Sequence, residues 1–111
     1  MIQLKDIKLE VMSLFNPMYL NQDNVDEIGF MAIYKDNETG KTINPEKLRD
    51  YLIIWTIEYK NSNEITNKEI IYKDNASLGY VIDYCHLKEY LKRFFTSIVI
   101  NVELTKIGQE G

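Results

Sequence analysis

The chain has 111 residues, of which 45% are hydrophobic and 27% charged, and this composition argues for one folded domain over residues 1–111 and against disorder. The formal net charge is −4 and Cys85 is the only cysteine, which excludes an intramolecular disulfide and a multi-cysteine metal site. Charged residues near the N-terminus and the lack of a long apolar run argue against a signal peptide and a membrane span, so we expect a cytoplasmic protein.

The first predicted elements are strands. In residues 7–15, Ile7, Leu9 and Val11 alternate with charged residues, which is typical of a half-buried strand that ends before Pro17. Residues 18–27 form an acidic connection. Residues 28–35 (IGFMAIYK) are apolar on both faces, which predicts a central strand.

A repeat begins inside this central strand. Residues 33–52 (IYKDNETGKTINPEKLRDYL) match residues 71–91 (IYKDNASLGYVIDYCHLKEYL) when one residue is inserted into the second copy. Ten positions are identical: Ile33/Ile71, Tyr34/Tyr72, Lys35/Lys73, Asp36/Asp74, Asn37/Asn75, Gly40/Gly79, Ile43/Ile82, Leu48/Leu87, Tyr51/Tyr90 and Leu52/Leu91. The recurring tyrosines predict structural roles, and the match predicts two pseudo-equivalent strand–turn–helix units.

In the first copy, residues 36–40 form a predicted turn in which Gly40 supplies a positive φ. Asn44 and Pro45 follow with the residue types of a helix N-cap and first helical position. The next stretch is ambiguous, because Leu48, Leu52 and Trp55 lie on one helical stripe whereas alternate residues from 51 to 59 share one face of a strand. The repeat favours a helix over 45–54, followed by a strand near 55–60.

The second copy predicts a strand over 69–73 and a turn over 74–79. Asp83 then caps a predicted helix over 84–95, and residues 97–104 (SIVINVEL) form a final strand. The expected fold class is therefore α+β, with a mainly antiparallel or mixed sheet of four to six strands and two helices.

The sequence offers little chemistry. Cys85 and His86 are adjacent on the predicted helix, where neighbouring side chains point too far apart to form a thiolate–imidazolium pair, and packing and surface roles are favoured for them. The turns do not fit a calcium loop, because Gly40 and Leu48 stand at positions 5 and 12 counted from Asp36. No catalytic, cofactor-binding or metal-binding residue is predicted.

The negative charge suggests a binding role. Residues 1–40 hold seven acidic residues and three lysines, a balance of −4, whereas residues 41–111 hold ten of each sign. This balance disfavours nucleic acid and leaves room for a basic protein partner. The predicted contact residues are one aromatic and three acidic side chains of the 18–27 connection: Tyr19, Asp23, Asp26 and Glu27.

We therefore expect a small non-enzymatic protein-binding module, of accessory or inhibitory (immunity or anti-defence) type. Its richness in Ile, Asn, Lys and Tyr and its two alanines suggest an A/T-rich bacterial, phage or plasmid genome. Two alternatives stay open. One is a ligand-binding or enzymatic domain with a pocket between the repeats, and the other is a homo-oligomeric structural subunit of a phage or plasmid assembly.

Overall fold

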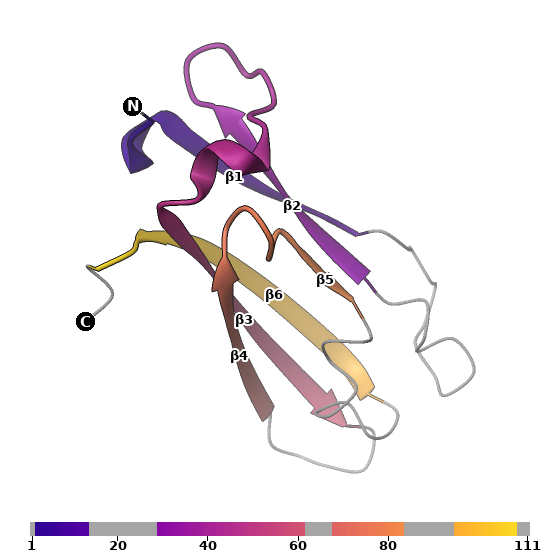
Figure 1. The fold of residues 1–111 in the computed structure, drawn as a ribbon. Coiled ribbons are helices and arrows are strands. Elements are labelled where there is room, and N and C mark those ends of the chain that lie inside the picture. Colours follow the sequence, from indigo (N-terminus) through magenta and orange to yellow (C-terminus); the bar gives the residue numbers. More distant parts are fainter. Residues whose placement is uncertain (1, 14–28, 62–67, 84–94, 109–111) are drawn as a thin grey trace.

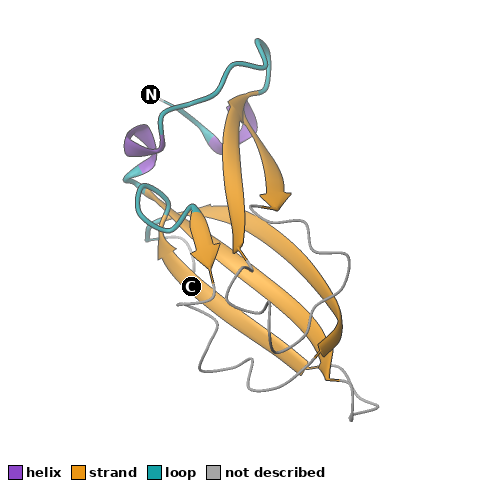
Figure 2. Cartoon of the chain, turned by 90° about the vertical axis from the view of Figure 1, so that its right-hand side faces the viewer, coloured by secondary structure: helices purple, strands orange, loops and turns teal. Residues whose placement is uncertain are grey.

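A computed structural model describes residues 2–13, 29–61, 68–83 and 95–108, and places them in two three-stranded antiparallel sheets (Figures 1 and 2). Sheet A has the order β1-β2-β5 and consists of β1 (Ile7–Ser13), β2 (Gly29–Asp36) and β5 (Val81–Asp83). Sheet B has the order β4-β3-β6 and consists of β3 (Tyr51–Asn61), β4 (Lys68–Asn75) and β6 (Phe95–Lys106). Two short 3-10 helices, η1 (Leu4–Asp6) and η3 (Pro45–Leu48), complete the described elements.

The predicted α+β class with two helices is wrong, because the described part of the chain is mainly β and holds no helix of seven residues or more. The helix expected over 45–54 is the four-residue η3, after which β3 begins at Tyr51. The helix expected over 84–95 falls outside the described residues except for Phe95, which begins β6. No described helix is long and apolar enough to cross a membrane.

β3 is extended because extension buries a complete face of the strand. Its alternate residues Tyr51, Ile53, Trp55, Ile57 and Tyr59 are all buried. β3 also pairs with β4 on one side and with β6 on the other, so its backbone groups find partners along both edges. A helix over the same residues would present only part of this face to the core.

The predicted strands are confirmed within the described residues: β1 for 7–15, β2 for 28–35, β3 for 55–60, β4 for 69–73 and β6 for 97–104. The start of η3 is also as predicted, since the Asn44 side chain accepts a hydrogen bond of 3.1 Å from the Glu46 amide and Pro45 stands in the first turn. Gly40 has the expected positive φ, of 73°.

The core lies between the two sheets. Trp55 and Ile57 of β3 are fully buried, as are Ile82 of β5 and Leu48 of η3. The indole Nε1 of Trp55 donates a buried 2.8 Å hydrogen bond to the carbonyl oxygen of Gly79. The buried polar atom of this large aromatic side chain is therefore satisfied inside the core.

Both copies of the repeat send the chain to the same edge of β2. After the first turn, the Ile43 amide donates to the Tyr34 carbonyl at 2.7 Å. After the second turn, the Ala32 amide donates to the Tyr80 carbonyl at 2.7 Å, and β5 continues along β2. The repeat is thus visible as a strand, a turn and a returning segment beside β2, and in its first copy no long helix follows.

Candidate partner-binding surface

The predicted contact residues Tyr19, Asp23, Asp26 and Glu27 lie outside the described residues. The structure does show where the segment 14–28 that contains them begins and ends. It connects Ser13, the last residue of β1, with Gly29, the first residue of β2. Ser13 and Phe30 are partners in the β1–β2 ladder, so both ends of this connection are at the same end of sheet A.

At that end, three apolar residues form one row across the outer face of sheet A. Met12 of β1 is the register partner of Met31 of β2, and Met31 is also the partner of Val81 of β5. Since Ala32 and Ile82 point into the core, their neighbours Met31 and Val81 point to the opposite face. We call Met12, Met31 and Val81 the apolar row. The exposed fraction of Met12 is 50%.

The other end of the same face is charged. Glu10 Oε2 lies 2.9 Å from Lys35 Nζ, and Glu10 Oε1 lies 3.9 Å from Lys8 Nζ. The hydrogen bond from Lys35, with the positive charges of Lys35 and Lys8, lowers the pKa of the Glu10 carboxyl. Because these groups are exposed, they contribute little to stability. They place charged groups at the end of this face that lies away from the 14–28 connection.

A cleft of about 570 Å³ lies beside the first turn of the repeat, and its lining includes Ile2, Asp6, Asp36, Lys41 and Lys47. Backbone amides of Thr39 and Glu38 donate to Asp36 at 3.0 and 2.9 Å, and these hydrogen bonds lower the pKa of the Asp36 carboxyl. The carboxylate is therefore used to close the turn. Among the described residues, no group of three His, Cys, Asp or Glu side chains is placed to hold a metal ion.

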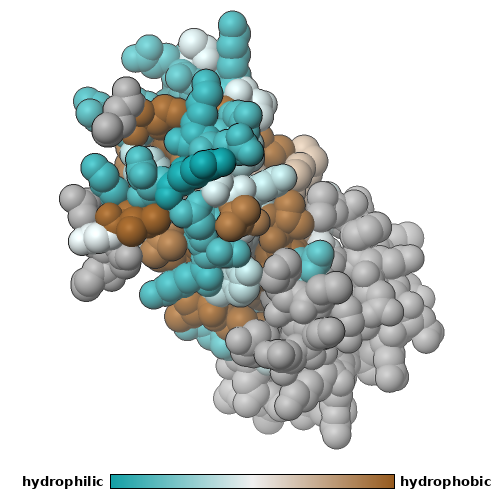
Figure 3. Space-filling model, viewed as in Figure 1, coloured by the Kyte–Doolittle hydropathy of each residue, from teal (hydrophilic) through white to brown (hydrophobic). Residues whose placement is uncertain are grey.

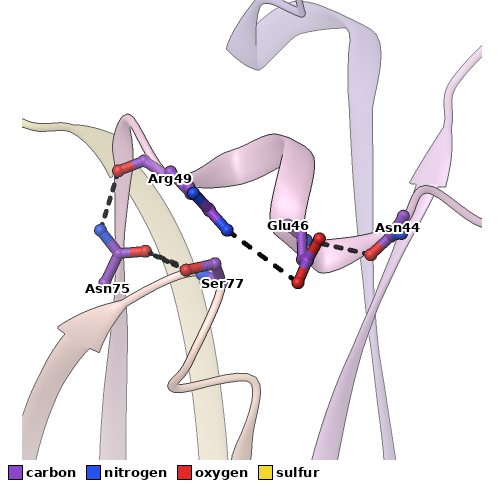
Figure 4. Close-up of polar contacts among 5 residues, drawn as sticks. All are labelled: Asn44, Glu46, Arg49, Asn75 and Ser77. Atoms are coloured by element: carbon purple, nitrogen blue, oxygen red, sulfur yellow. Dashed lines mark hydrogen bonds and ion pairs between the residues drawn. The ribbon is translucent and has the colours of Figure 1, made fainter.

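A smaller groove, of about 350 Å³, is lined by both copies of the repeat (Figure 4). Asn75 Nδ2 donates to the Arg49 carbonyl at 2.8 Å, and Asn75 Oδ1 accepts from Ser77 Oγ at 2.6 Å. The Arg49 guanidinium reaches 4.0 Å from the Glu46 carboxylate. Leu78, which also lines the groove, is the most exposed large apolar side chain of the described residues, at 76%.

Sequence reasoning missed the apolar row. The alternation in residues 7–15 does place Met12 on the solvent side of its strand, but Met31 lies in a stretch that is apolar on both faces. Only the strand register brings Met12, Met31 and Val81 into one line. Cys85 and His86, the two residues considered for nucleophilic chemistry, lie outside the described residues.

On the face viewed in Figure 3, apolar side chains occur in several groups separated by hydrophilic ones. Comparison with known proteins adds no relative: no protein-family model matches the chain, and no curated protein and no solved structure matches it. The interpretation of the surface therefore rests on its own geometry.

Proposed function

We propose that this chain is a small cytoplasmic protein-binding module without catalytic activity, acting as an accessory or inhibitory protein. The observation that carries the proposal is the apolar row Met12–Met31–Val81, which adjoins both ends of the acidic 14–28 connection. Protein interfaces combine an apolar centre with a polar rim. In this proposal the apolar row is the centre, and the acidic connection supplies part of the rim.

The residue types favour a protein partner. Methionine side chains are unbranched and polarizable, so they adapt to the shape of an opposing surface. Asp23, Asp26 and Glu27 are three of the seven acidic residues in 1–40, and their negative charge would attract a basic partner surface and speed its association. Tyr19 is the aromatic side chain of the connection best suited to serve as an anchor.

The test is a tagged pull-down from a low-GC bacterial lysate, followed by affinity measurement with the recovered protein. Met12→Lys places a charge in the apolar row and should weaken binding on the order of tenfold or more, the penalty of desolvating a charge at an interface centre. The triple variant D23K/D26K/E27K should weaken it through charge reversal.

The matched control is Ile71→Lys, on the outer face of sheet B, because the exposed fractions of Ile71 and Met12 are 55% and 50%. This control should bind the partner as the wild type does. Equal binding by M12K and the wild type would exclude the apolar row, and equal binding by the triple variant would exclude the acidic residues.

The groove lined by both copies of the repeat supports a second candidate function, small-ligand binding. Its lining combines the Arg49 guanidinium with the exposed Leu78 side chain, which suits a ligand with an anionic and an apolar part. A panel of small carboxylates and phosphates should then raise the melting temperature of the wild type. The variant Arg49→Glu should abolish the shift, and a panel without any shift would exclude this candidate.

A further inference from the structure

The edge of β6 that pairs with no other described strand carries the further inference, which is independent of the apolar row. Tyr51 and Lys106 are register partners, and the next pair along the ladder, Asp50 and Ile107, is joined by a 2.9 Å hydrogen bond from the Ile107 amide. In an antiparallel ladder, hydrogen-bonded pairs alternate with pairs whose backbone groups point away. The odd-numbered residues of β6 therefore bond to β3, whereas Ile98, Ile100 and Val102 direct their N–H and C=O groups to the opposite edge.

The other side of β3 confirms this alternation. The Ala76 amide donates to the Tyr51 carbonyl at 2.9 Å, so the backbone of Tyr51 faces β4 and not Lys106 of β6. β6 is a terminal strand of sheet B. In the part of the chain that the structure describes, no backbone hydrogen bond reaches the outward-directed groups of Ile98, Ile100 and Val102.

The middle of this edge also lacks the features that keep strand edges apart, whereas the charged residues Glu103 and Lys106 lie towards its C-terminal end. Residues 97–102 (SIVINV) contain no charged residue, no proline and no glycine. The opposite edge strand of sheet B, β4, carries Glu69 and Lys73 on its outer face, and β1 of sheet A carries Lys8 and Glu10. Charged side chains on an edge strand disfavour pairing with a strand of another molecule. An apolar edge without such charges favours this pairing.

We propose that two copies of this chain pair through this edge, with antiparallel β6 strands related by a two-fold axis at Ile100. Ile100 would face Ile100 of the second copy, and Ile98 would face Val102 of the second copy. Each pair would exchange both of its N–H···O hydrogen bonds. The two B sheets would then form one continuous sheet across the dimer.

The side chains of β6 are compatible with this register. Ile98, Ile100 and Val102 pack against the core, so the pairing extends the inner layer of each sheet with apolar residues of the same kind. On the outer face, Val99, which is 53% exposed, would lie opposite Asn101 of the second copy. Glu103 would lie opposite position 97, a serine, so the pairing opposes no like charges.

The first described residues of the chain lie near one end of β6 and not at its middle. The Tyr51 hydroxyl donates to the Ile2 carbonyl, and Tyr51 is the register partner of Lys106. The N-terminal residues therefore lie at the Lys106 end of β6. The proposed pairing is centred on Ile100, towards the middle of the strand.

The experiment measures the solution mass of the full chain by sedimentation equilibrium over a range of concentrations. The wild type should show twice the chain mass of 13.1 kDa. In the double variant V99K/N101K, each new lysine at position 99 opposes one at position 101 of the second copy. Two such repulsive pairs should raise the dimer dissociation constant on the order of tenfold or more.

The charge-swapped variant V99K/N101E provides the matched control, because the same positions then hold opposite charges across the axis and the dimer should persist. Both positions are exposed, so the monomer should fold in either variant, as circular dichroism would verify. Ile71→Lys, on the other edge strand of sheet B, and Met12→Lys should leave the dimer unchanged. A monomeric wild type, a V99K/N101K dimer as stable as the wild type, or equal loss of dimer in both double variants would overturn the proposal.

Discussion

The two turns of the repeat share a pattern of hydrogen bonds but differ in their surroundings and in the closing glycine, which has a positive φ at Gly40 and not at Gly79. The Gly40 amide donates to the Asp36 carbonyl at 2.8 Å, and the Gly79 amide donates to the Asn75 carbonyl at 2.7 Å. The side-chain oxygens of Asp36 and Asn75 each accept from the amide two residues later. The sequence match pairs Asp36 with Asp74. In the structure, however, it is Asn75 that accepts the hydrogen bonds equivalent to those of Asp36. The inserted residue is thus accommodated before the turn closes.

The surroundings of the two turns differ. Residues 37–42 are exposed, whereas Ala76 and Gly79 of the second turn are buried. The carbonyls of Ala76 and Gly79 accept hydrogen bonds from Tyr34 and Trp55 in the core. The repeated sequence therefore specifies the hydrogen bonds that close the turn, and the position of the turn in the fold decides how much the stability of the protein depends on it.

The largest expected difference in stability is between alanine variants of the two turn glycines, Gly79 and Gly40. A Cβ atom on Gly79 would lie 2.5 Å from the Asp74 Cβ and 3.0 Å from the Ile53 Cγ2, so Gly79→Ala requires the backbone to move. We expect the free energy of unfolding to fall by about 3 kcal/mol, the upper part of the range for overpacked cores. Urea denaturation would measure this, and a loss below that of Gly40→Ala would contradict the comparison.

The next largest difference in stability is expected between phenylalanine variants of the matched tyrosines, Tyr34 and Tyr72. Tyr34 is buried, and its hydroxyl donates to the Ala76 carbonyl at 2.8 Å. Tyr34→Phe leaves that buried carbonyl without its donor and should lower the free energy of unfolding by about 2 kcal/mol. Tyr72→Phe removes a 3.2 Å hydrogen bond to Asp74 in a half-buried place and should cost less. Equal losses in urea titrations would show that burial does not distinguish the two positions.

Gly40→Ala should have a smaller effect than either core variant. Nothing lies within 4 Å of a Cβ atom on Gly40, so the cost is the positive φ of 73° alone. Left-handed backbone costs a residue with a side chain about 1 kcal/mol. Gly40→Asn, which tolerates this conformation better, is the matched control and should recover part of the loss in thermal and urea unfolding.

The smallest expected effect is a pH dependence confined to the first turn. Hydrogen bonds from Thr39 and Glu38 lower the pKa of Asp36 below its ordinary value of 3.8. Ionised Asp36 therefore stabilises the fold above about pH 4, and this contribution is lost as the pH falls through the lower folded-state pKa. The difference in stability between wild type and Asp36→Asn should shrink below pH 4. A difference that is constant from pH 7 to pH 2.5 would contradict this assignment.

Residues 45–61 show how far sequence reasoning reached. The Asn44–Pro45 helix start was predictable because capping depends on neighbouring residues alone. The continuation was predicted as a helix by analogy with the second copy of the repeat, although Ile53, Ile54 and Ile57 favour extended structure. The analogy failed because matching residues do not impose the same partners, and β3 has a strand on each side.

The candidate surfaces were less accessible to prediction than the strands. The acidic residues of 18–27 were identified from charge alone, and they lie outside the described residues. The apolar row and the groove each combine residues from different elements, so neither follows from the spacing of residues along one segment. The excess of acidic residues in 1–40 suggested a basic protein partner, but it did not identify the surface that would bind this partner.

The sequence by itself determined the local features of this protein: the strands predicted over 7–15, 28–35, 69–73 and 97–104, which are strands wherever the structure describes them, the two turns of the repeat and the Asn44 cap. These features depend on alternation, on positive φ and on side-chain hydrogen bonds over a few residues. The tertiary structure decided that Tyr51–Asn61 extends, that the second turn enters the core, and that β6 lies at an edge. The physical reason is that these outcomes depend on which strands pair, and strand pairing depends on how residues from distant segments pack together in one core.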